Sequence, residues 1–364
     1  MESIFSLSMD HLCSVALGLL ACAVGTTGCS AEPSTPALST EPGELIVHYI
    51  DVGQADCELL LSDGSAMLID AGNNADGDMV VDYLKEQGVT KLDYVVGTHP
   101  HEDHIGGLDD VINNFEVGTV IMPEAESNTK TFEDVLDAID AQGLSITTPV
   151  PGDVYDFGGI LFTILAPNGD SYSSLNDYSV VLQVVNGEDS FLFTGDAETE
   201  SEAEMLQKGL SLRSTVLKVG HHGSRTSSSE EFLNAVSPTY AIISCETGND
   251  YGHPHQETLD RLQAHDITYF RTDTQGTIIA YSDGDGVTFN TQPAWSSGSS
   301  STSGTSSVPE TSTPADDPTV AVTKSGKKYH RPDCSQIQKS TLTEMTRSEA
   351  IAQGYEPCKN CKPE

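Results

Sequence analysis

Residues 98–107 read Thr-His-Pro-His-Glu-Asp-His-Ile-Gly-Gly, so three imidazoles and an aspartate fall within six residues. The apolar run before them, residues 92–97, predicts a buried strand. Polar groups that follow a buried strand lie at its carboxyl end, where α/β proteins usually keep their chemistry. One or two histidines in such a loop would be ordinary surface residues, but the spacing His-x-His-x-Asp-His is typical of a metal site.

The order of the ligand types indicates two cations rather than one. His99 and His101 lie two residues apart on backbone that the intervening proline keeps extended, so both imidazoles can face one ion. Asp103 and His104 follow as the chain turns into a helix, and their side chains diverge from the first pair. Centres with two neighbouring metal ions are built in this way, and in such a centre we expect Asp103 also to orient the attacking water.

This segment resembles the signature of the metallo-β-lactamase superfamily. Three further stretches, 48–56 (His-Tyr-Ile-Asp-Val-Gly-Gln-Ala-Asp), 68–72 (Leu-Ile-Asp-Ala-Gly) and 217–224 (Leu-Lys-Val-Gly-His-His-Gly-Ser), resemble the C-terminal domain of the ComEC competence proteins. The resemblance covers about residues 45–290. It implies an α/β fold of the αββα sandwich type, in which two packed sheets are covered by helices on their outer faces.

Two aspartates stand at the ends of other predicted strands. Asp196 follows Phe193-Thr-Gly, and the resemblance implies that it bridges the two metals. Asp70 follows Leu68-Ile69, and the resemblance implies that it accepts a hydrogen bond from a ligand histidine and so fixes the tautomer of that ring. A carboxylate that merely forms a turn is the alternative for Asp70.

His221 and His222 follow another predicted strand, and one of them should be the last ligand of the second metal. Because consecutive side chains on extended backbone diverge, we expect the other to face substrate or a neighbouring strand. The sequence leaves open which of the two histidines is the ligand.

Many members of the superfamily have one more histidine, before the bridging aspartate, as the third ligand of the first metal. This chain has no histidine between His104 and His221, and Asn176 stands where that ligand is expected. We therefore expect the first metal to be bound more loosely. Harder oxygen donors would shift the preference from zinc toward manganese, so the divalent ion stays open between the two.

Four residues near the expected centre are candidates for contacting a phosphate, in addition to Asn176. Ser224 and Arg225 offer a hydroxyl and a guanidinium, although a capped turn before the next helix would use the same residues. By resemblance, the loop that contains His253 and His255 closes over the substrate. We assign His253 to substrate binding and His255 to proton donation to the leaving group; a loop that caps the following helix is the alternative.

Alternating strands and helices must position these residues. We expect strands at residues 45–50, 57–61, 66–69, 92–97, 119–122, 160–165, 180–185, 190–193, 215–219, 240–244 and 278–281. We expect helices at residues 78–87, 105–115, 131–142, 197–207, 229–236 and 256–265.

The C-terminal region differs from the rest in charge. Residues 319–364 carry 8 of the 17 Lys and Arg but only 5 of the 55 Asp and Glu, a net charge of +3, so the rest carries -41. So short a segment cannot bury a large hydrophobic core and needs another source of stability. One histidine and three cysteines could supply it by binding a structural zinc. The four ligands are His330, Cys334, Cys358 and Cys361. A disulfide between the last two cysteines is the alternative. The module resembles small zinc-binding domains of secreted bacterial nucleases and of the DNA-repair protein Ada.

The N-terminal region predicts export. Residues 1–29 contain an apolar stretch too short for a transmembrane helix, and they end like a bacterial lipoprotein signal, with Cys29 as the lipidated residue and Cys22 as a second candidate. A secreted protein without a lipid is the alternative. The predicted organisation is a signal (1–29), a tether (30–43), a hydrolase domain (44–292), a Ser/Thr/Pro/Gly linker (293–318) and the zinc module (319–364).

The formal net charge of -38 counts against broad electrostatic binding of nucleic acid. The leading hypothesis is an exported phosphodiesterase that acts on DNA at the outer face of a bacterial cytoplasmic membrane or beyond it. A second hypothesis is a phosphorylcholine-type esterase that acts on cell-wall phosphodiesters with the same centre. A third is a surface binding protein without catalysis, whose tail docks a partner.

Overall fold

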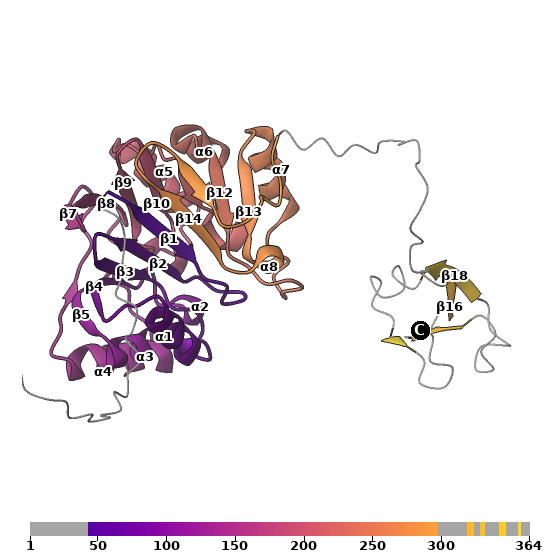
Figure 1. Cartoon of the computed structure of the whole chain (residues 1–364), viewed down its shortest axis with the longest axis horizontal. Helices are drawn as coiled ribbons and strands as arrows, with labels where there is room; N and C mark the ends of the chain where they lie inside the picture. The colour runs from indigo at the N-terminus through magenta and orange to yellow at the C-terminus, as the bar shows by residue number, and fades with distance from the viewer. Residues whose placement is uncertain (1–42, 298–318, 324–327, 332–341, 347–355, 358–364) are drawn as a thin grey trace, which may run out of the picture. The chain divides into compact units, whose positions relative to one another are not determined.

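The computed structural model describes residues 43–297, 319–323, 328–331, 342–346 and 356–357. The chain divides into two compact units, Met1–Ser300 and Ser301–Glu364. In the first unit the described residues form two sheets with helices outside them (Figure 1). Within the described ranges, no helix is both long and apolar enough to cross a membrane.

The first sheet has the strand order β15-β14-β1-β2-β3-β4-β5-β6. Its strands are β1 (Leu45–Tyr49), β2 (Glu58–Ser62), β3 (Ser65–Ile69), β4 (Lys91–Val96), β5 (Glu116–Ile121), β6 (Ile146–Thr147), β14 (Ile278–Ser282) and β15 (Val287–Phe289). The strands from β3 to β6 pair in parallel, so β3 and β4 end at the same edge of the sheet.

The second sheet has the strand order β13-β12-β11-β10-β9-β8-β7. Its strands are β7 (Val154–Phe157), β8 (Ile160–Ala166), β9 (Val181–Asn186), β10 (Asp189–Phe193), β11 (Val216–Lys218), β12 (Tyr240–Ile243) and β13 (Thr268–Arg271). The strands from β10 to β13 pair in parallel, and the segments that follow β10, β11 and β12 therefore leave the sheet together.

Apolar residues of both sheets pack between them. Tyr49 of β1 stacks on Phe193 of β10 with ring centroids 6.1 Å apart. Along β2, Leu60 joins this inner layer, whereas Leu59 and Leu61 pack on the opposite face. This alternation is the two-residue period of a strand, and it explains why three successive residues of β2 are leucines: both faces of the strand are buried.

Helices cover the outer faces of the sheets. They are α1 (Gly77–Glu86), α2 (Glu102–Ile105), α3 (Leu108–Asn114), α4 (Lys130–Ala141), α5 (Thr199–Lys208), α6 (Glu230–Val236), α7 (Gln256–Ala264) and α8 (Thr272–Gln275), with 3-10 turns η1 (Leu175–Tyr178) and η2 (Gly220–Gly223). Apolar faces of α1, α3 and α4 pack on the first sheet, and those of α5, α6 and α7 pack on the second (Figure 1). The predicted αββα sandwich is confirmed.

The helix predicted at 105–115 is wrong in one respect, because the chain forms α2 and α3 with a break at Gly106 and Gly107. A Cβ on Gly106 would lie 2.2 Å from the backbone carbon of Asn73, and one on Gly107 would lie 2.5 Å from the carbonyl oxygen of Ala71. The turn after β3 thus packs directly on this glycine pair. The close packing ties the turn that carries Asp70 to the histidine motif.

The described residues of the second unit form a sheet with the order β18-β16-β17-β19. Its strands are β16 (Thr319–Thr323), β17 (Lys328–His330), β18 (Leu342–Thr346) and β19 (Glu356–Pro357). His330 ends β17 opposite Ala321, and its side chain is buried. The other three predicted zinc ligands, Cys334, Cys358 and Cys361, lie outside the described residues, as do the predicted signal with Cys29 and most of the predicted linker.

The position of Trp295 generates a prediction about the end of the first unit. Its backbone exchanges hydrogen bonds with Tyr269 of β13, and the two rings stack with centroids 5.8 Å apart. We expect a chain shortened to residues 43–292 to fold, but with a free energy of unfolding about 2 kcal/mol below that of residues 43–297. Urea denaturation of both chains measures the difference, and equal midpoints would contradict it.

Candidate metal centre

The residues of the histidine motif and three later segments meet at the carboxyl ends of the parallel strands. The motif follows β4 of the first sheet, whereas Asp196 follows β10, the histidine pair follows β11, and His253 lies in the loop after β12 of the second sheet. Each sheet therefore contributes part of the centre. The geometry depends on how closely the two sheets approach at this edge.

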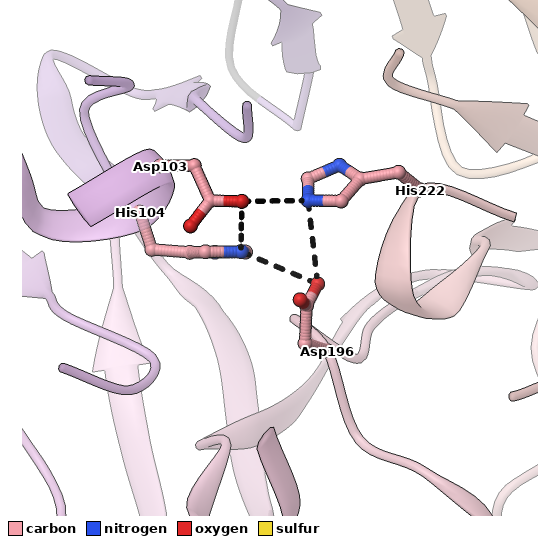
Figure 2. Close-up of side chains that lie close together, drawn as sticks. All are labelled: Asp103, His104, Asp196 and His222. Carbon is pink, nitrogen blue, oxygen red and sulfur yellow. Dashed lines mark ion pairs between the residues drawn. The ribbon is translucent and has the colours of Figure 1, made fainter. Parts of the chain in front are cut away.

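Four side chains, Asp103, His104, Asp196 and His222, converge on one point (Figure 2). His104 Nε2 lies 3.2 Å from Asp196 Oδ1, and His222 Nε2 lies 3.3 Å from Asp103 Oδ2. Three of the converging atoms, His104 Nε2, His222 Nε2 and Asp196 Oδ1, are buried and make no hydrogen bond within the described structure. Buried polar atoms without partners are costly, and a cation between them would satisfy all three at once.

The other oxygen of Asp196 faces a second set of imidazoles. Asp196 Oδ2 lies 3.9 Å from His99 Nε2 and 3.7 Å from His221 Nε2. His101 Nδ1 lies 2.9 Å from His99 Nε2. Asp196 thus presents one oxygen to each set, so its carboxylate would lie between the two cations if both sets held one.

The structure places both members of the histidine pair at the centre. The extended backbone that we expected is wrong, because His221 and His222 have left-handed conformations with φ of 50° and 53° within η2. This curl turns His221 toward Asp196 Oδ2 and His222 toward Asp196 Oδ1. His221 therefore lies where the sequence left the first metal one ligand short. Asn176, predicted at that place, lies beside it, with its Nδ2 3.4 Å from His221 Nδ1.

A carboxylate lies behind each of three imidazoles that face Asp196. The Nδ1 of His104 lies 2.7 Å from Asp70, and that of His221 lies 3.2 Å from Glu198. The Nδ1 of His222 lies 3.2 Å from Asp56, but its hydrogen bond goes to the carbonyl oxygen of Ser244, 3.1 Å away. A carboxylate in this position holds the proton on Nδ1 and leaves Nε2 free to ligate a cation. Asp70 was predicted for this role, whereas Asp56 and Glu198 were not, although Asp56 ends the motif at 48–56.

Burial beside carboxylates sets the charges of the metal-free centre. Burial lowers the pKa of His104, but the larger effect of Asp196 and other carboxylates raises this pKa well above the ordinary value. Burial opposes the charge on His222 too, yet Asp196 and Asp56 raise its pKa to about 10. His99 differs, since burial and the neighbouring His104 hold its pKa well below the ordinary value. Without metal, the rings of His104 and His222 therefore each carry a second proton, and their positive charge takes the place of the charge that metal ions would supply.

A pocket of about 940 Å³ opens over the centre. Its lining comprises Asp51, Val52, Gly53, Gln54, Asn73, Asp76, Met79, His101, Glu102, Asp103, Asn176, Asp196, His221, His222, Glu246, Tyr251 and His253. None of these lining residues of the described chain is a lysine or an arginine. Apart from the histidines, the ionisable side chains of the lining are therefore carboxylates and the Tyr251 phenol.

Two side chains of the 251–255 loop stand at this pocket. The ring of His253 lies 5.3 Å from that of His221. Tyr251, which is 69% exposed, stacks on the ring of His253. Gln54 Oε1 accepts a hydrogen bond from the amide of Glu246, so its Nε2 donates to His253 Nδ1, 3.3 Å away. Burial, reinforced by His221, lowers the pKa of His253 to about 4. At neutral pH, His253 is thus an uncharged ring whose remaining nitrogen, Nε2, carries a proton.

Three residues predicted near the substrate lie outside the lining of this pocket, although the ring of His255 is 4.9 Å from that of His253. His255 precedes α7, and its Nδ1 accepts a hydrogen bond from the amide of Arg225. The exposed Arg225 side chain pairs with Glu257, 3.6 Å away, and the buried Ser224 shares a hydrogen bond with Thr226. None of the three lines the pocket. Ser224 and Arg225 lie in the turn before α6, which is capped by Ser229, whereas His255 stands at the N-cap position of α7 without a capping hydrogen bond from its side chain.

Comparison with known proteins gives matches to one family. A model of the metallo-beta-lactamase superfamily matches residues 50–247. ComE operon protein 3 of Bacillus subtilis (strain 168) is 35% identical over 261 residues, which are 67% of this chain and 33% of that protein. Competence protein ComA of Neisseria gonorrhoeae is 33% identical over 65% of this chain and 32% of its own length. The chain thus spans about a third of the length of these curated relatives.

Among solved structures, the metallo-beta-lactamase fold protein YhfI from Bacillus subtilis is similar with a TM-score of 0.42 and 13% identity, covering 62% of this chain and 95% of that one. CmlA, a diiron beta-hydroxylase from Streptomyces venezuelae, is similar with a TM-score of 0.43 and 16% identity, covering 64% of this chain and 53% of that one.

Metal uptake by the metal-free protein should release protons, because the ligand imidazoles must be neutral where they coordinate. The raised pKa values of His104 and of His222 (about 10) predict a release of about two protons at pH 7.5 when the centre takes up metal. Since protons compete with the cations, affinity should rise with pH up to about 10. Calorimetric titration in buffers of different ionisation enthalpy measures the release. A His222→Gln variant should release about one proton fewer, and an unchanged release would contradict the assignment.

Proposed function

This chain belongs to the metallo-β-lactamase superfamily, and from that premise we propose that residues 44–292 are a dinuclear metal phosphodiesterase of the ComEC-like branch, with DNA as substrate. The observation that carries the proposal is Asp196, which presents its two oxygens to two sets of imidazoles. Three unpartnered buried atoms around it fit a cation. The choice of DNA as the substrate rests on the ComEC-like resemblance of the chain, which its similarity to ComE operon protein 3 and competence protein ComA supports.

The donor atoms divide into two ligand sets that share Asp196. We assign His99, His101 and His221 to the first metal, and Asp103, His104 and His222 to the second. Imidazole and carboxylate donors together fit zinc or manganese. Divalent ions bound there supply charge that polarises a phosphoryl oxygen and lowers the pKa of water.

The protein's own residues then act on the water and on the leaving group. Asp103 is 33% exposed in its side chain, and it reaches both the ligand set and the pocket, so its carboxylate can accept the proton of the attacking water. His253 Nε2–H can donate a hydrogen bond to a phosphate oxygen or to the departing oxygen. The carboxylates behind the ligand imidazoles hold these rings in place through the reaction.

The acidic pocket favours a second candidate function. A phosphodiester that carries a positive charge, such as a phosphorylcholine ester of the cell wall, would be attracted by Asp51, Asp76, Glu102 and Glu246. DNA would be repelled by these same carboxylates and must be held by the metal centre itself. The third hypothesis, a surface binding protein without catalysis, gives no function to Asp103 and His253 at the pocket.

We further propose that the enzyme is exported, with residues 1–29 as the signal and lipidation of Cys29 as a membrane tether. A structural zinc held by His330, Cys334, Cys358 and Cys361 would staple the C-terminal module. Its charge of +3 against -41 elsewhere suits contact with a phosphate backbone.

The mature protein with Mn²⁺ or Zn²⁺ should hydrolyse single- or double-stranded DNA, and Asp103→Ala should reduce the rate by about 10²-fold or more. Asp82→Ala, which removes an exposed carboxylate of α1, is the matched control and should retain full activity. Gel assays of labelled oligonucleotides, with chelated protein as the blank, measure both.

Other results of these assays would replace or reject parts of the proposal. Two bound metals with no cleavage of DNA, but with hydrolysis of p-nitrophenyl phosphorylcholine, would replace the first candidate by the second. Full DNA cleavage by Asp103→Ala would reject the assigned centre. Unchanged cleavage after removal of residues 298–364 would show that the body alone is the enzyme.

A further inference from the structure

Lys218, the last residue of β11, is a lysine inside the core. Its side chain is 1% exposed, and its Nζ donates hydrogen bonds to Asp56 Oδ2 at 2.7 Å and to the carbonyl oxygen of Val219 at 3.2 Å. A buried ammonium is costly unless it is paired and hydrogen-bonded. Leucine or methionine would pack better at this position, so packing does not explain the buried positive charge of Lys218.

Asp56, the partner of this lysine, connects to the metal ligands in several ways. It lies between β1 and β2 and is 1% exposed. Its Oδ1 lies 3.2 Å from His222 Nδ1 as an ion pair, whereas the hydrogen bond of His222 Nδ1 goes to the carbonyl oxygen of Ser244 at 3.1 Å. The backbone N–H of Asp56 donates to the carbonyl oxygen of Asp103 at 3.0 Å. Its own carbonyl oxygen accepts a hydrogen bond from Gly72, in the turn after Asp70. Asp56 thus contacts two ligands of the second metal, one by its side chain and one by its backbone.

The Lys218–Asp56 pair also joins the two sheets. Asp56 belongs to the first sheet's side of the sandwich, as Asp103 and His104 do, whereas Lys218 belongs to the second, as Asp196 and His222 do. The pair therefore crosses the same gap that the second ligand set must span. The ammonium donates a hydrogen bond to Oδ2, while Oδ1, which has no hydrogen-bond partner in the described structure, lies 3.2 Å from His222 Nδ1.

We propose that Lys218 and Asp56 are positioning residues for the second metal: Lys218 fixes the Asp56 carboxylate, and Asp56 in turn holds His222 beside Asp103. The nearest oxygens of Asp56 and Asp70 lie within 4.8 Å of each other beside His104, so the ammonium also offsets the combined negative charge of these two carboxylates. The inference rests on the metal centre of the proposed function, and it does not depend on the substrate.

Manganese titration of the full-length protein tests the proposal, with binding followed by calorimetry and by the spin-coupled EPR signal of two neighbouring ions. Lys218→Met and Asp56→Asn should each weaken the second ion about 10–100-fold, the usual effect of losing a residue that orients a ligand, and leave the first within about threefold. The coupled signal should then vanish at concentrations that saturate the wild type.

The double variant Lys218→Met/Asp56→Asn separates positioning from packing. If Lys218 acts through Asp56, removal of the lysine in the Asp56→Asn background should weaken the second ion no further. The double variant replaces the ion pair by neutral groups of similar shape, so it should fold even where Lys218→Met alone leaves a buried carboxylate unpaired. Losses of affinity that add in the double variant would overturn the proposal.

Lys91→Met is the matched control, because Lys91 pairs with Asp93 at 3.0 Å on the surface of the same unit. It should bind two manganese ions like the wild type. Wild-type binding of both ions by folded Asp56→Asn and by the folded double variant would reject the positioning role. Failure of the wild type to bind any manganese or zinc would instead reject the metal centre itself, and the two failures are thus distinguishable.

Discussion

The centre depends on how closely the two sheets approach where β4 and β10 end. Gly195 has a φ of 48°, and a Cβ there would lie 2.9 Å from the Cβ of Thr98, so only glycine lets these two strand ends touch. Val180 donates its N–H to the carbonyl oxygen of Thr98, and the hydroxyl of Ser179 accepts the N–H of Asp196. Asp196 is thereby fixed between ligands from both sheets, and the spacing of the ligand sets follows from this contact.

Close approach concentrates charge that the fold must balance. Asp56, Asp70 and Asp196 are buried near one another, and Lys218 alone among the described lysines is buried with them. Asp56 shows the two opposing effects: burial raises its pKa, but the positive charges of Lys218 and His222 lower it to about 2. Protons on imidazoles complete the balance without metal, and cations would replace these protons on binding. Folding and metal uptake are linked through these residues.

The sequence was informative where chemistry depends on local spacing. The motif at 98–107, the strand ends before Asp70 and Asp196, and the layered fold are all local patterns or a family resemblance. The sequence could not give the left-handed curl of η2, because no local rule predicts two successive residues with positive φ outside glycine and asparagine. Nor could it pair Asp56 with Lys218, which lie 162 residues apart and meet only after the sheets pack.

The pocket restricts how any phosphodiester can reach the centre. Carboxylates of Asp51, Asp76, Glu102 and Glu246 surround it, and two divalent cations would offset charge only at its base. A polyanion lying across the opening would meet these carboxylates at every phosphate, at a cost that falls with added salt. A substrate that inserts one phosphodiester while its remaining charges stay in solvent avoids most of that cost. The electrostatics therefore favour a chain end, a flexible strand or a small diester over a rigid duplex.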